Sequence, residues 1–165
     1  SSNYVGYINI KNFEHNGDNL RKRRIKIFKE RNLPTANLIH PSSYVSPKTY
    51  IGSSVIIARD CYVRAKSYIG DFCFLDSGAA IAHDVRLGEN VIMTPYSFIA
   101  GFVNIGDNVM IGAGSKIVNG YVDKILTVGN DAKIMAGSTI FKDVPDGKFI
   151  TNTGKILRRL DLKKE

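Results

Sequence analysis

The chain has 165 residues, enough for one domain with a sizeable core, and 44% of them are hydrophobic although none is Trp. A formal net charge of +8 favours anionic partners, but Lys and Arg gather near the two ends (21–31 and 155–164) without any nucleic-acid-binding motif. We therefore expect no nucleic acid partner, and these charges either attract phosphorylated small molecules or are simply solvated. Two cysteines and no secretory or membrane segment indicate a cytoplasmic protein without membrane insertion.

The first residues predict a short strand followed by a basic helix. Residues 4–10 mix aromatic and β-branched side chains, which is typical of a strand. Asp18 is a plausible N-cap for a helix over 19–31, and Pro34 stops that helix. This part of the chain, residues 1–38, is expected to be an appendage to the main domain.

A repeat of six residues follows and dominates the chain. Four positions after each aliphatic residue of the repeat stands a small or β-branched residue, and Gly follows every third aliphatic residue, where a corner needs positive φ or close approach. The aliphatic positions are Ile39, Val45, Ile51, Ile57, Val63, Ile69, Leu75, Ile81, Leu87, Met93, Ile99, Ile105, Ile111 and Ile117. Periods of six and eighteen fit neither a helix nor a hairpin; they predict a parallel β-solenoid with three strands per coil. Residues eighteen apart then stack about 4.8 Å from one another.

The repeat slips once, by five residues after Val122, and restarts at Val128. Such an insertion predicts a loop that bulges from one corner. The edge strands of the terminal coils need covering, so we expect the helix at one end of the solenoid and the segment from Lys142 at the other. The predicted boundaries are 1–38 for the appendage, 39–141 for the solenoid and 142–165 for a C-terminal cap and basic tail.

The segment Ile-Gly-Asp-Asn-Val-Met-Ile-Gly-Ala-Gly-Ser (105–115) resembles the hexapeptide-repeat acyltransferases. That resemblance implies an all-β fold, a left-handed parallel β-helix, with the strand and helix as a short N-terminal appendage. The motifs at 16–24, 38–47 and 82–91 are similar to bacterial sugar acetyltransferases of the sialic acid and bacillosamine pathways, over roughly residues 16–150. This closer similarity implies a homotrimer that uses acetyl-CoA. It also implies that residues 1–38 end an α/β acceptor-binding domain.

One of the three histidines stands out as a candidate base. His15 falls in a polar loop, and His40 suits a capping or hydrogen-bonding role in the first coil. His83 occupies an outward corner and is followed by Asp84, and acyl transfer needs a base near neutrality with a carboxylate to orient it. Gly101 lies eighteen residues further on, so its N–H should lie one coil away beside the imidazole, where an oxyanion needs a donor.

The resemblance assigns roles to these residues. The matching His is the general base, the acidic residue is its partner, and the matching Gly backbone binds the thioester carbonyl, here Gly101. We expect the pantetheine of acetyl-CoA to lie along Gly112 and Ala113. A metal is disfavoured, because Ala65 and Gly101 flank His83 in its column and neither is a ligand.

The sequence thus predicts an acetyltransferase that moves an acetyl group from acetyl-CoA to an amino or hydroxyl group of a sugar, most simply a nucleotide-linked amino sugar for surface glycan synthesis. Two alternatives stay open: O-acetylation of a sialic-acid-like sugar, and a non-catalytic trimeric solenoid that acts as a binding scaffold. The sequence does not identify the acceptor sugar or distinguish N- from O-transfer.

Overall fold

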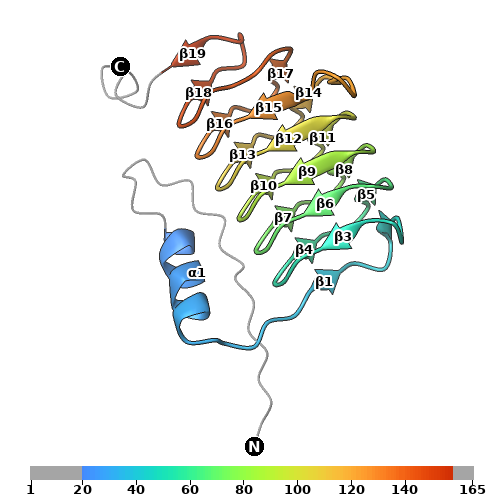
Figure 1. The fold of residues 1–165 in the computed structure, drawn as a ribbon, viewed down its shortest axis with the longest axis vertical. Coiled ribbons are helices and arrows are strands. Elements are labelled where there is room, and N and C mark those ends of the chain that lie inside the picture. The colour runs from blue at the N-terminus through green and yellow to red at the C-terminus, as the bar shows by residue number, and fades with distance from the viewer. Residues whose placement is uncertain (1–19, 158–165) are drawn as a thin grey trace, which may run out of the picture.

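The computed structural model describes residues 20–157, so the strand expected over 4–10 lies outside the described residues. Within this range one helix, α1 (Leu20–Glu30), precedes a stack of short strands in three sheets (Figure 1). The helix matches the expected span of 19–31 to within one residue at each end. It ends where Asn32 takes a φ of 46° and Leu33 N–H donates to the Phe28 carbonyl at 3.0 Å.

Each of the first five coils, from β1 to β15, contributes one strand to each sheet. The first sheet contains β1 (Leu38–Ile39), β4 (Ile56–Ile57), β7 (Phe74–Leu75), β10 (Ile92–Met93), β13 (Met110–Ile111), β16 (Lys133–Ile134), β18 (Phe149–Ile150) and β19 (Ile156–Leu157). The second contains β2 (Tyr44–Val45), β5 (Tyr62–Val63), β8 (Ala80–Ile81), β11 (Phe98–Ile99), β14 (Lys116–Ile117) and β17 (Thr139–Ile140). The third contains β3 (Tyr50–Ile51), β6 (Tyr68–Ile69), β9 (Val85–Leu87), β12 (Val103–Ile105) and β15 (Leu126–Val128).

The strand register confirms the eighteen-residue period. Ile57 pairs with Leu75 in the first sheet, Val63 with Ile81 in the second and Ile69 with Leu87 in the third, and each pair is parallel. The aliphatic column points inward, and the core residues from Val55 to Ile150 are at most 6% exposed. The parallel β-helix predicted from the sequence is therefore confirmed.

The column of small residues packs beside the aliphatic column and hydrogen-bonds to backbone carbonyls of the next coil. Ser67 Oγ donates to the Ala82 carbonyl at 2.9 Å, and Ser115 Oγ donates to the Met135 carbonyl at 2.7 Å. Because these hydroxyls find partners inside the solenoid, small polar residues are tolerated in a buried column.

The recurring glycines are explained by close approach rather than by positive φ. A Cβ at Gly88 would collide with the Asp107 carboxylate and the backbone of the coil above, and one at Gly70 would collide with the Gly88 carbonyl. The positive φ at this corner is taken two residues later, by Phe72 at 57° and Asn90 at 56°. The sequence predicted that these corner positions need glycine, but it did not decide between positive φ and close approach as the reason.

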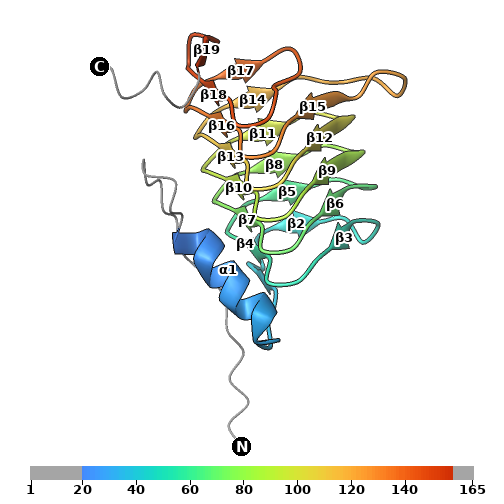
Figure 2. The ribbon, with the colours of Figure 1, turned by 60° about the vertical axis from the view of Figure 1, so that its left-hand side comes forward.

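Helix α1 lies along the side of the solenoid and not across its end, so the expected cap is wrong (Figure 2). The Arg21 guanidinium is buried, where it donates to Asn90 Oδ1 at 2.7 Å and to the Phe72 carbonyl. Ile25 packs on Phe72, and Lys29 pairs with Glu89. These contacts hold the helix against the corner between the third and first sheets, and Ile39 in the first coil stays 42% exposed.

The five-residue slip forms a loop between β14 and β15, as predicted. The pairing interval grows from eighteen to twenty-three residues there, with Val103 opposite Leu126. Tyr121 and Lys124 exchange backbone hydrogen bonds of 3.0 Å, so residues 121–124 form a tight hairpin. At the C-terminal end β18 continues the first sheet in parallel, and β19 folds back on it antiparallel.

Candidate active site at the corner between the second and third sheets

His83 and Asp84 form the corner that joins β8 to β9. The ring nitrogen Nδ1 of His83 lies 2.9 Å from Asp84 Oδ2, and the two side chains are 39% and 33% exposed. Asp84 takes a φ of 56°, a left-handed conformation that Asp tolerates better than most residues. In the neutral ring, the Asp84 carboxylate as acceptor favours the tautomer with the proton on Nδ1, in which Nε2 carries the lone pair.

Gly101 lies beside the imidazole, as the eighteen-residue period predicts. A Cβ added at Gly101 would lie 2.8 Å from His83 Cε1 and 3.1 Å from Nε2, so Nε2 faces the space above this glycine. The imidazole ring also meets Phe102 edge to face, with ring centroids 5.3 Å apart and an interplanar angle of 82°. Among the described residues no hydrogen-bond partner of Nε2 is present, which leaves this nitrogen open to a ligand.

A fourth residue, which the sequence interpretation missed, completes the corner. Asn119 stands eighteen residues after Gly101, and its Oδ1 accepts the Gly101 N–H at 2.7 Å. The Asn119 Nδ2 donates to the Gly120 carbonyl at 2.9 Å. The N–H expected to be free beside the imidazole is therefore present but engaged. The signal that could have found Asn119 is its place in the same column as His83 and Gly101.

Gly112 and Ala113 lie at a different corner, between the first and second sheets. Gly112 is buried, and a Cβ there would collide with the backbone of Ala136, so packing alone requires glycine. Ala113 is exposed, its carbonyl accepts the Gly137 N–H at 2.8 Å, and its own N–H has no partner within residues 20–157. The structure brings together His83, Asp84 and Gly101, whereas the second sheet separates this group from Ala113 in one chain.

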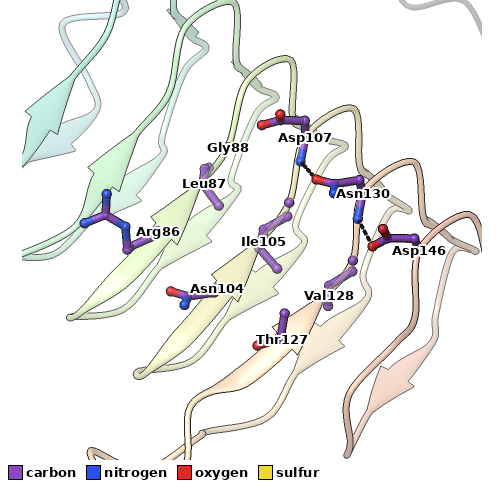
Figure 3. A pocket seen from close by; sticks show the side chains of 12 residues that line it. Arg86, Leu87, Gly88, Asn104, Ile105, Asp107, Thr127, Val128, Asn130 and Asp146 are labelled. Atoms are coloured by element: carbon purple, nitrogen blue, oxygen red, sulfur yellow. Dashed lines mark hydrogen bonds between the residues drawn. The ribbon is translucent and has the colours of Figure 1, made fainter.

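A shallow hollow of about 320 Å³ lies away from this corner, on the outer face of the third sheet (Figure 3). It is lined by Arg86, Asn104 and Thr127, with the glycine column at its edge. The dashed bonds in Figure 3 are backbone N–H groups of Asp107 and Asn130 donating to the side chains one coil above, at 2.8 Å each. The residues that line the hollow include no His and no Cys, so it lacks the base that acyl transfer needs.

Both cysteines are unsuited to covalent catalysis. Cys61 and Cys73 are buried, and their Sγ atoms approach the carbonyls of Asp76 and Gly88 at 3.2 Å. Burial raises the pKa of the Cys73 thiol to about 12 and also raises the pKa of the Cys61 thiol. Because the thiolate is the nucleophilic form, neither residue offers one near neutral pH.

The described part of the chain has neither a candidate metal site nor a helix suited to a membrane. Residues 20–157 contain no group of three His, Cys, Asp or Glu side chains placed to hold a metal ion. In the same range no helix is long and apolar enough to cross a membrane.

The coil geometry reproduces the six-residue period of the sequence, with parallel strands paired at intervals of eighteen residues. The family description "Bacterial transferase hexapeptide (six repeats)" matches residues 66–101, which include His83, Asp84 and Gly101. Together with the solved structures below, this match confirms the predicted resemblance and the left-handed β-helix. No curated protein matches the sequence.

Among solved structures, a histidine-to-asparagine variant of perosamine N-acetyltransferase from Caulobacter crescentus, in complex with CoA and GDP-perosamine, is 29% identical with a TM-score of 0.77. The acetyltransferase domain of PglB from Neisseria gonorrhoeae, in complex with acetyl coenzyme A, is 27% identical with a TM-score of 0.76. WeeI from Acinetobacter baumannii, 24% identical with a TM-score of 0.80, shares the fold.

Each superposition covers 84% of this chain. It covers 64% of the perosamine N-acetyltransferase chain, 65% of the PglB domain and 66% of WeeI, so the chain spans just under two thirds of the length of these neighbours.

Proposed function

We propose that the chain is an acetyl-CoA-dependent sugar acetyltransferase whose acceptor is a nucleotide-linked amino sugar. The observation that carries the proposal is the oriented imidazole: Nδ1 of His83 is tied to Asp84, and Nε2 faces the space above Gly101. The neighbours support the substrate classes, because one holds CoA with GDP-perosamine and another holds acetyl coenzyme A.

The reaction follows from this arrangement. The acceptor amine attacks the thioester carbonyl carbon, and His83 Nε2 takes the proton that the amine loses. The Gly101 N–H is the donor for the negative charge that forms on the carbonyl oxygen. When the tetrahedral intermediate collapses, the carbon–sulfur bond breaks, and the CoA thiolate receives the proton from His83. Transfer is direct, because both described thiols are buried and protonated.

The coenzyme is expected to contact Ala113 through its pantetheine amides, since the Ala113 N–H is exposed and without a partner within residues 20–157. Ala113 and His83 lie at different corners of one chain, with the second sheet between them. In the proposed homotrimer, one coenzyme would contact His83 of one chain and Ala113 of its neighbour. Tyr62 and Phe98, 50% and 40% exposed on the second sheet, are candidates for the contact between chains. Phe72 is not one, because α1 covers it.

The test is an assay of CoA release from acetyl-CoA with a panel of amino sugars and their nucleotide conjugates. We expect saturable release that depends on one acceptor class, and His83→Ala should lower kcat by ~10²–10⁴-fold while coenzyme affinity changes little. His40→Ala is the matched control, because His40 is an exposed solenoid histidine whose ring, among residues 20–157, hydrogen-bonds only to Ser42. A folded His83→Ala variant with wild-type turnover, or a wild-type protein with no affinity for acetyl-CoA, contradicts the proposal.

A further inference from the structure

The amide of Asn119 is held at both ends, which fixes its orientation. Its Oδ1 accepts the Gly101 N–H at 2.7 Å, and its Nδ2 donates to the Gly120 carbonyl at 2.9 Å. A flipped amide would place NH₂ against the N–H and oxygen against the carbonyl, so both contacts would become repulsive. In the free protein the Gly101 N–H therefore has a definite acceptor.

That acceptor borders the same space as the proposed base. A Cβ at Gly101 would lie 3.1 Å from His83 Nε2 and 3.2 Å from Asn119 Oδ1, so the two atoms flank one small volume above this glycine. Asn119 is exposed, so its side chain can turn into solvent without disturbing the core. A single N–H cannot serve two acceptors at full strength, because hydrogen bonds weaken steeply away from linear geometry.

We propose that Asn119 is a positioning residue that competes with the thioester for the Gly101 N–H. Its carbonyl oxygen occupies the place of the thioester carbonyl oxygen, and it gives up this hydrogen bond when acetyl-CoA binds for transfer. The proposal rests on the proposed function, since it specifies how the same site receives its acyl donor. Asn119 should therefore affect the binding of acetyl-CoA and not the binding of CoA, because CoA has no acetyl carbonyl to compete for the Gly101 N–H.

The distinguishing measurement is the ratio of the dissociation constants of CoA and acetyl-CoA, obtained by calorimetry on the full chain. Removing the competitor in Asn119→Ala should raise the preference for acetyl-CoA by about fivefold, which is the weight of one ordinary hydrogen bond. Asn119→Asp keeps the shape of the side chain and presents a full negative charge, which accepts the Gly101 N–H more strongly. This variant should therefore lower the preference for acetyl-CoA over CoA and lower kcat. A merely structural role would weaken both ligands alike and leave the ratio unchanged.

Asn108→Ala is the matched control. Asn108 Oδ1 accepts a hydrogen bond of 2.9 Å from Asn90 Nδ2 at the corner between the third and first sheets, so the variant loses a similar bond at a different corner from His83. We expect its ratio to equal that of the wild type. Equal ratios in wild type, Asn119→Asp and any folded Asn119→Ala overturn the role of Asn119 while the proposed function stands. A wild-type protein that binds neither ligand overturns both proposals.

Discussion

Replacing Asp84 by Gly separates the catalytic value of the carboxylate from its structural value. Asp84 has a φ of 56°, a left-handed conformation that costs most residues roughly 1–2 kcal/mol. Gly adopts it without this cost, so the substitution should add about 1 kcal/mol to the free energy of unfolding. The greater freedom of Gly in the unfolded chain costs about 0.5–1 kcal/mol. The lost pair with His83 costs about 0–1 kcal/mol, because both side chains are partly exposed.

These three contributions nearly cancel, so the unfolding free energy of Asp84→Gly should change by no more than about 1 kcal/mol. Turnover should respond differently. Without the carboxylate the imidazole loses the acceptor that fixes its proton on Nδ1, and kcat should fall roughly 10- to 100-fold. That loss is smaller than the one expected for His83→Ala, because the ring itself remains.

The assay combines thermal unfolding with steady-state kinetics, and Asp60→Gly serves as the control. Asp60 has a φ of 59° at the corner between the first and second sheets, so its replacement relieves the same conformation without touching His83. We expect both variants to melt within about 3 °C of the wild type. Wild-type kcat in Asp84→Gly, or an equal loss in Asp60→Gly, would refute the orienting role of the carboxylate.

The remaining predictions concern the fold. Cys61 and Cys73 should resist thiol reagents until the protein unfolds, as timed labelling at pH 8 can show. The raised pKa of Cys73 stabilises the fold below pH 9, and this contribution should disappear as the pH rises from 9 towards 12 in denaturant titrations. Arg21→Ala should cost ~3 kcal/mol of helix docking, seen as faster proteolysis of α1, because a buried hydrogen-bond donor is lost. Gly88→Ala should lower the melting temperature, because the added Cβ would collide with the Asp107 carboxylate and break its hydrogen bond with the Glu89 N–H. Glu89→Ala is the control, since it keeps this backbone N–H and therefore the hydrogen bond.

The sequence predicted the solenoid because its interior is periodic. Each coil buries the same two kinds of side chain at the same positions, so Ile57, Leu75 and Met93 had to stack whatever the corners contained. The period also placed the five-residue loop after β14. Both features depend only on residues that face the core, where every coil must bury the same kinds of side chain.

The placement of α1 could not be predicted in the same way. Its sequence is basic, and its few apolar residues, which include Ile25 and Phe28, indicate a buried face without indicating which part of the solenoid that face contacts. The helix is held by Arg21, a residue that rarely lies inside unless it is paired. Its partners, Asn90 and the Phe72 carbonyl, are separated from it by 69 and 51 residues and belong to no repeated pattern.

The candidate site was predictable in part for a related reason. His83, Asp84 and Gly101 were found because base, carboxylate and glycine have a known chemical use together, and the period placed them on adjacent coils. Gly112 and Ala113 came from resemblance alone, and their contacts with a coenzyme stay a prediction. Asn119 was missed because no rule required an acceptor for a corner N–H that was expected to be free.

The corner geometry itself does not mark the site, because three successive coils share it. Lys66, Asp84 and Phe102 take φ values of 61°, 56° and 56° at the same corner in successive coils. What differs is the outward residue just before each of them, and that residue is not constrained by the core. A column of Ala65, His83, Gly101 and Asn119 can therefore change its chemistry one coil at a time without altering the packing beneath it. The residue one coil above Gly101, here Asn119, can therefore vary without disturbing the core, and its ability to accept a hydrogen bond sets how readily the Gly101 N–H can bind an acyl donor.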